Sequence, residues 1–195
     1  MPALRSLLIL LPLGLLSSCA HPRLRMPPMP ETVLKAEVPE PVLFEWTGPS
    51  VQGKPRVRID LGEQKARIYD GTQEIAWTYV ATGVENHPTP RGNFVISEKK
   101  ADKKSNIWGI IEDAEGDTIN WDAHSQRSRI PKGGRFVGAP MPNWMRLTSS
   151  GIGMHAGPIP DPGSPASHGC IRLPSEMAAR MFDELPSGTP VSIVD

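Results

Sequence analysis

The sequence predicts a mainly β domain, a β-sandwich or barrel-like fold with one C-terminal helix. From residue 56 onward, short runs of alternating apolar and polar residues are separated by turn residues, the pattern of half-buried strands. With 22 prolines and 18 glycines in 195 residues, the chain is rich in turns. Only residues 174–185 carry apolar side chains at helical spacing, which argues against a helix bundle.

The expected strands lie at residues 56–61, 66–69, 75–82, 93–97, 143–148, 151–155 and 191–194. Asp70-Gly71 is expected to form a two-residue hairpin turn, whose central positions both need positive φ. Ser175 is the candidate N-terminal cap of the helix. Residues 99–142 are rich in Gly and charge and are expected to be irregular, as an insertion or a lid over a site.

The composition indicates one soluble domain that does not bind nucleic acid. The chain is 38% hydrophobic and 22% charged, and its length suffices for one domain with a core. Acidic and basic residues balance at 21 each, and no stripe rich in Lys and Arg is present. A field able to attract a polyanion is therefore not expected.

The first 18 residues are typical of an export signal. A short apolar run follows Arg5 and is too short to span a bilayer as a stable helix. It ends in Leu16-Ser17-Ser18-Cys19, which resembles the bacterial lipobox, so residues 1–18 are interpreted as a lipoprotein signal peptide. The resemblance implies that Cys19 carries the lipid that anchors the protein to a membrane. The alternatives are an ordinary signal peptide and a disulfide between Cys19 and Cys170.

A proline-rich tether is expected over residues 19–55, followed by the folded domain over residues 56–195. Eight prolines after His21 leave no room for a regular helix and favour an extended spacer. Phe44 and Trp46 are exceptions that are able to dock on the domain, so order is expected from about residue 42.

Cys170 lies in a segment that collects groups able to activate a thiol. Only the thiolate is strongly nucleophilic, and a free thiol is mostly protonated at neutral pH. His155 or His168 is able to take this proton, leave a thiolate–imidazolium pair, and return the proton to a departing amine. Gly169 lets the backbone bend, and the N–H groups of residues 169 and 170 are candidate donors to an oxyanion.

Arg172 is the candidate for binding a substrate carboxylate, because in a strand it points to the same side as Cys170. Two other interpretations of these residues remain open. In the first, Cys170 is a small residue buried in the core, where free cysteines are commonly found. In the second, the two histidines and the cysteine bind zinc, although their spacing matches no familiar zinc-finger pattern.

These residues resemble the signature of the L,D-transpeptidase family, also called the YkuD domain. The family pattern is a histidine, a small residue and glycine, followed after a spacer by Ser/Thr-His-Gly-Cys, an apolar residue and Arg. It is matched by His155-Ala156-Gly157 and by Ser167-His168-Gly169-Cys170-Ile171-Arg172. Upstream, Thr89-Pro90-Arg91-Gly92-Asn93-Phe94 matches a Thr-Pro-x-Gly-x-Phe element. The resemblance covers residues 56–195.

The resemblance implies a mainly β fold and an enzyme that acts on peptidoglycan stem peptides without a metal or another cofactor. Cys170 would attack the carbonyl of the diamino acid, expel D-Ala and form a thioester that an amine acceptor resolves. His155 would be the general acid/base, and His168 would shape the pocket or aid the oxyanion. The residues implied to hold substrate or supply backbone geometry are Arg172, Gly157, Ser167 and Gly169. Carbapenems would acylate the cysteine.

A bacterial envelope location, on the periplasmic side and anchored through lipid, follows from the two resemblances together. The spacer between Gly157 and Ser167 is slightly short for the family and holds four prolines, so the identity of the acceptor is left undecided. A carboxypeptidase or amidase that uses water is the hydrolytic alternative. A wall-binding lipoprotein without catalytic activity is the other alternative.

Overall fold

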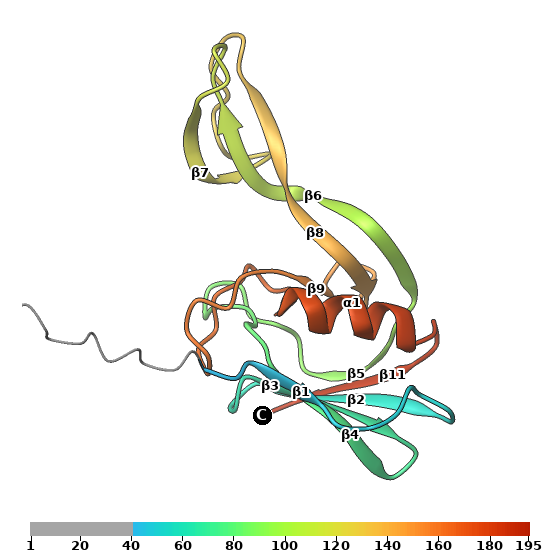
Figure 1. Cartoon of the computed structure of the whole chain (residues 1–195). Helices are drawn as coiled ribbons and strands as arrows, with labels where there is room; N and C mark the ends of the chain where they lie inside the picture. The colour runs from blue at the N-terminus through green and yellow to red at the C-terminus, as the bar shows by residue number, and fades with distance from the viewer. Residues whose placement is uncertain (1–40) are drawn as a thin grey trace, which may run out of the picture. The chain divides into compact units, whose positions relative to one another are not determined.

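The computed structural model describes residues 41–195, which form two β-sheets and one α-helix (Figure 1). The expected signal peptide, the lipidation site Cys19 and the tether up to residue 40 lie outside the described residues. None of the described helical residues belongs to a segment long and apolar enough to cross a membrane. The elements are β1 (Phe44–Trp46), β2 (Pro55–Asp60), β3 (Lys65–Asp70), β4 (Gln73–Tyr79), β5 (Gly92–Val95), β6 (Glu98–Glu112), β7 (Thr118–His124), β8 (Arg135–Arg146), β9 (Gly153–Ala156), β10 (Ile171–Leu173), α1 (Ser175–Glu184) and β11 (Pro190–Val194).

The first sheet has six strands in the order β1-β4-β3-β2-β11-β5. β2, β3 and β4 form an antiparallel meander, whereas β11 returns to lie parallel to β2. In β2, Val57 and Ile59 are buried while Arg56 is exposed, as the alternating pattern predicts. The sheet therefore has one face that packs on the core.

The second sheet has five strands in the order β10-β9-β8-β6-β7. Helix α1 packs against β8 and β9 and lies between these strands and the first sheet (Figure 1). Its buried residues Met177, Ala178 and Met181, with Leu185 at its C-cap, join the core formed by β2, β3, β4, β8, β9, β10 and β11. The expected mainly β fold with one C-terminal helix is confirmed in the described part of the chain.

Residues 99–142 are not irregular, and this expectation is wrong. β6 and β8 leave the body of the domain as a long antiparallel pair, and β7 adds to β6 near the far end (Figure 1). We call these three strands the extension. The first half of β6 reads EKKADKKS and is largely exposed on both faces. A strand without a buried face has no alternating apolar pattern, so its sequence gives no strand signal.

Two local expectations also change. The β3–β4 hairpin exists, but its loop is Gly71-Thr72 rather than Asp70-Gly71, and only Gly71 has positive φ. Pro174 rather than Ser175 is the N-cap of α1, and no side chain caps the helix. The expected docking of Phe44 and Trp46 is confirmed, because Phe44–Trp46 forms β1 on the edge of the first sheet and packs against the core. Apolar side chains at the end of the tether thus extend the sheet.

Candidate active site

The two strands that follow the extension bring the candidate nucleophile and base together. β9 and β10 are parallel neighbours, with Arg172 in register with His155. Cys170 comes directly before β10, so it lies at the end of this strand beside β9. Both Cys170 and His155 line one cavity of about 300 Å³. Its other lining residues are Ser105, Trp108, Ala139, Pro140, Met141, Gly157, Pro158, Ser167, His168 and Arg172.

The imidazole of His155 is buried, with 6% of the residue exposed. Its Nδ1 lies 2.8 Å from the carbonyl oxygen of Ala156. Because a carbonyl only accepts, Nδ1 carries the proton in this contact, and Nε2 of the neutral ring is left as the acceptor. Burial lowers the pKa of His155, against the opposing effect of the Ala156 hydrogen bond. The ring is therefore neutral near pH 7 and able to accept a proton.

Burial also raises the pKa of the Cys170 thiol, although the Gly153 N–H and the charge of Arg172 act in the other direction. Within residues 41–195, the hydrogen-bond acceptor of this thiol is the carbonyl of Gly151, with Sγ 4.0 Å from the oxygen, and not the imidazole. These two shifts favour an uncharged thiol and an uncharged imidazole over the thiolate–imidazolium pair that the sequence suggests. Burial favours the uncharged form of each partner.

The turn before Cys170 requires glycine at position 169. Gly169 has a φ of +109°, and a Cβ there would lie 2.9 Å from Cδ1 of Ile152. The hydroxyl of Ser167 donates to the carbonyl of Cys170 and accepts the N–H of Gly169. The N–H of Gly169 is therefore occupied and is not a free oxyanion donor, contrary to the sequence-based expectation. Ser167 is buried and holds the shape of the turn.

His168 is held by the extension. Its ring stacks on Trp108 with 3.9 Å between centroids, and its Nε2 lies 3.2 Å from Oδ1 of Asp122. Burial lowers the pKa of His168, while Asp122 opposes this effect. A bulge in β6 determines the position of Trp108. Four residues of β6, 105–108, lie opposite the single residue Ala139 of β8, between the pairs Lys104–Pro140 and Gly109–Gly138.

Arg172 is half-buried and has no ion-pair partner within the described part of the chain. Gly157 leaves room for it, since a Cβ at Gly157 would lie 3.0 Å from Cγ of Arg172. An unpaired guanidinium that lines the cavity is available to a carboxylate. The described residues hold no cluster of three or more His, Cys, Asp or Glu side chains able to bind a metal, which counts against the zinc alternative.

Comparison with known proteins decides the family. Residues 54–193 match the model of the L,D-transpeptidase catalytic domain, YkuD. The chain belongs to this family. It is 26% identical over 204 residues to YciB of Bacillus subtilis (strain 168), provisionally named an L,D-transpeptidase, with 95% of each chain covered. The family acts on peptidoglycan and thus in the cell envelope.

Solved L,D-transpeptidases share the fold of this YkuD domain. A structure from Mycobacterium smegmatis matches with a TM-score of 0.55 and 19% identity, over 73% of this chain and 59% of that chain. The catalytic domain of an Enterococcus faecium L,D-transpeptidase matches with a TM-score of 0.51 and 23% identity, over 73% of this chain and 98% of that chain. The chain thus spans less than two thirds of the longer structure but nearly all of the isolated catalytic domain.

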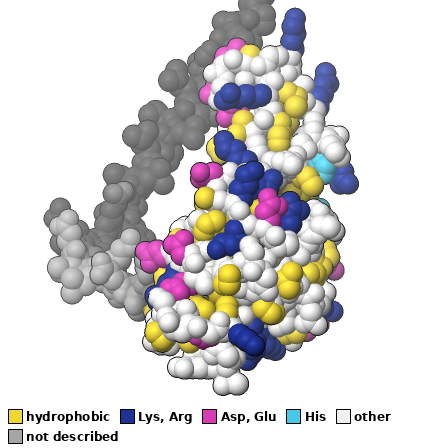
Figure 2. Space-filling view, turned by 90° about the vertical axis from the view of Figure 1, so that its right-hand side faces the viewer, with side chains coloured by type: hydrophobic (Ala, Val, Ile, Leu, Met, Phe, Trp, Pro, Cys, Tyr) yellow, Lys and Arg dark blue, Asp and Glu magenta, His cyan; other side chains and the backbone are white. Residues whose placement is uncertain are grey.

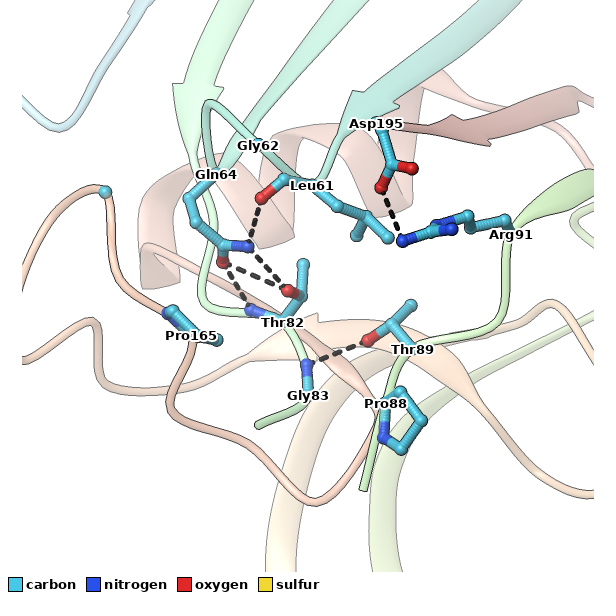
Figure 3. Close-up of a pocket in the computed structure, with 11 residues that line it drawn as sticks. Leu61, Gly62, Gln64, Thr82, Gly83, Pro88, Thr89, Arg91, Pro165 and Asp195 are labelled. Atoms are coloured by element: carbon cyan, nitrogen blue, oxygen red, sulfur yellow. Dashed lines mark hydrogen bonds and ion pairs between the residues drawn. The ribbon is translucent and has the colours of Figure 1, made fainter. Parts of the chain in front are cut away.

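Thr89 of the YkuD domain supports the turn at Gly169 that precedes Cys170, a contact that the sequence did not reveal. Its hydroxyl donates to the carbonyl of Gly169 and accepts the N–H of Gly83, both at 2.8 Å (Figure 3 shows the second bond). Thr89 is the first residue of the Thr-Pro-x-Gly-x-Phe element. The motif therefore singled out Thr89 but did not indicate that it contacts Gly169. Trp108 and Asp122 were missed as well, because nothing in the local sequence connects them to His168.

The cavity beside Thr89 is larger, about 690 Å³, but it is a poor candidate for the site (Figure 3). Its polar side chains are paired with one another: Arg91 binds Asp195, and the amide of Gln64 binds Thr82 and the carbonyl of Leu61. A binding site needs polar groups that are free to meet a ligand. The smaller cavity at Cys170 therefore remains the candidate active site.

The direction of the shift in the pKa of Cys170 is testable by alkylation of the thiol. Because iodoacetamide reacts with the thiolate and burial raises the pKa of Cys170, we expect the alkylation rate of the Cys19→Ser chain to rise with pH. Its midpoint is expected above about 8.5, the ordinary thiol value. The same chain unfolded in urea is the reference and should have the lower midpoint. A midpoint below about pH 7 in the folded chain would instead show an ion pair.

Proposed function

We propose that the protein is a peptidoglycan L,D-transpeptidase with Cys170 as its nucleophile. Family membership supports the reaction class. The observation that carries the residue assignment is that Cys170, directly before β10, and a tautomer-fixed His155 in the neighbouring β9 line the same cavity. A thiol nucleophile with an adjacent general base is the arrangement that acyl transfer needs.

In the first half-reaction, Nε2 of His155 takes the thiol proton as Sγ of Cys170 attacks the carbonyl of the diamino acid. The bond from this carbonyl to the amine of D-Ala breaks, and His155 returns the proton to the departing amine. The product is a thioester on Cys170. In the second half-reaction an amine acceptor attacks the thioester carbonyl, so that a new amide bond forms and the C–S bond breaks. His155 takes the proton of this amine and passes it to the departing Sγ, which restores the thiol. The N–H of Cys170 is the candidate oxyanion donor, since that of Gly169 is bound to Ser167.

Charges around the site support an anionic peptide as substrate. Arg172 lines the cavity, and a second cavity of about 290 Å³ that also reaches Cys170 is lined by Lys103 and Arg146. Figure 2 shows Lys and Arg side chains gathered on the extension and around its base, on the face in view. Four lysines of β6, at positions 99, 100, 103 and 104, belong to this part of the chain. A stem peptide that ends in a D-Ala carboxylate complements these charges.

The proposal is tested by incubating the protein with disaccharide tetrapeptides and identifying the products by mass spectrometry. Transpeptidation yields free D-Ala and cross-linked dimers. D-Ala with shortened monomers alone would identify the hydrolytic alternative, in which water resolves the thioester. No product at all, together with no meropenem adduct on the peptide that contains Cys170, would identify a wall-binding protein without catalysis and refute the proposal.

We also propose that Cys19 is lipidated and anchors the catalytic domain on the periplasmic side of the envelope. The support is the sequence Leu16-Ser17-Ser18-Cys19 after an apolar run. Labelling of cells with an alkyne fatty acid should mark the wild-type protein and leave the Cys19→Ser variant unmarked. Equal labelling of both proteins would reject the anchor.

A further inference from the structure

A third cavity continues from the candidate active site along the extension. Its volume is about 350 Å³. It shares five lining residues with the cavity at Cys170: Trp108, Ala139, Pro140, His168 and Arg172. Beyond them it reaches Trp121 and Asp122 of β7. A ligand bound at Cys170 is therefore able to continue into this space without leaving the surface of the domain.

Trp121 gives this cavity a flat apolar wall. It is 78% exposed, more than any other large hydrophobic residue within residues 41–195. In the described part of the chain its indole takes part in no aromatic pair and no hydrogen bond. Its neighbour on the same face of β7 is Ile119, which is 53% exposed, and the polar residues Asn120 and Asp122 precede and follow it in the chain. An exposed indole that lines a cavity fits a small ligand with one flat apolar face.

The polar groups of the cavity complement a sugar. The guanidinium of Arg172 has donors to spare, and the exposed carboxylate of Asp122 has acceptor capacity beyond its contact with His168. A pyranose ring offers C–H bonds on one face and hydroxyl or amide groups around its rim. The C–H bonds pack on the negative face of an indole, as the positive edge of an aromatic ring does.

The length of a stem peptide is compatible with a sugar in this cavity while the peptide reacts at Cys170. If the proposed function holds, the reacting carbonyl belongs to the third residue of the stem, and the sugar is attached before the first. Three extended residues span about 10 Å. Arg172 follows Cys170 by two residues along β10, a distance of about 7 Å for a strand. It lines both cavities. The sugar would then lie one cavity away from the reacting bond.

We propose that the cavity at Trp121 is a saccharide subsite that binds the amino sugar of the donor stem, with Trp121 as the stacking surface. This inference rests on the proposed function, because that function places a glycan-linked peptide at Cys170. It predicts that the enzyme distinguishes a stem peptide attached to its glycan from the free peptide.

The test compares kcat/KM for D-Ala release from the disaccharide tetrapeptide with that from the free tetrapeptide, using the full chain. We expect the wild type to prefer the disaccharide substrate by roughly threefold to tenfold, as the strength of aromatic contacts suggests. Trp121→Ala should bring this ratio close to one, and Trp121→Phe should keep part of it. Ile119→Ala is the matched control, because Ile119 is exposed on the same strand but does not line the cavity, and should keep the wild-type ratio.

A wild-type ratio of one, or equal loss of the ratio in the variants of Trp121 and Ile119, would overturn the saccharide subsite. If the wild type releases D-Ala from neither substrate, the proposed function fails instead. The subsite is then tested by calorimetric binding of the same two compounds to the Cys170→Ser chain, with and without Trp121→Ala. Tighter binding of the disaccharide compound that depends on Trp121 would support the subsite, and equal binding would overturn it.

Discussion

Replacing Cys170 with alanine is expected to lower kcat/KM for D-Ala release by about 10⁴-fold or more. Alanine has no lone pair to attack the carbonyl, so the thioester cannot form. Binding is expected to survive, because Arg172 and the rest of the cavity wall stay in place. The measurement is D-Ala release from a tetrapeptide, with intact mass after meropenem treatment as a second readout. The variant should gain no meropenem mass.

Cys19→Ser is the matched control for this prediction, since it removes the other cysteine of the chain. The purified Cys19→Ser protein should keep its D-Ala release and its meropenem adduct. The Cys170→Ala protein should also melt within a few degrees of the wild type, because only one partly buried sulfur is lost. D-Ala release by Cys170→Ala at a tenth of the wild-type rate would show that another residue is the nucleophile.

Much of the lining of the candidate site was predictable because neighbouring positions in the chain supply it. Ser167, Gly169 and Cys170 form one turn, and the hydrogen bonds that shape this turn are local. His155 lines the same cavity as Cys170 because β9 and β10 pair side by side; a strand at 151–155 was expected, but β10 was not. Local turn residues and the apolar pattern of a buried face can both be recognised in a sequence.

The extension and its contacts were not predictable for the opposite reason. Much of β6 is solvated, so its apolar pattern is lost, and the bulge that presents Trp108 depends on its register with β8. Asp122 meets His168 only because β7 folds back beside β6. The direction in which the pKa values of Cys170 and His155 shift was not predictable either, because it depends on burial, and burial is a property of the whole fold.

The general acid/base is expected to be His155 and not His168, although both line the cavity. In His155→Gln the amide fills much of the same space but cannot carry a proton between the thiol and the departing amine. We expect kcat/KM to fall by about 10²-fold to 10⁴-fold. His168→Gln is the matched comparison: it removes the stacking on Trp108 and the Asp122 pair, and it should cost only about tenfold as a positioning effect.

The pH profile separates the two histidines further. As pH falls through the pKa of His155, the imidazole gains a proton and can no longer accept one from the thiol, so kcat/KM should fall. Burial lowers this pKa, which places the acidic limb below about pH 6.5, the ordinary value for histidine. The limb should persist in His168→Gln and disappear from the residual activity of His155→Gln. The reverse result, with the larger loss and the missing limb in His168→Gln, would assign proton transfer to His168, because a ring that only shapes the pocket does not set a titration of kcat/KM.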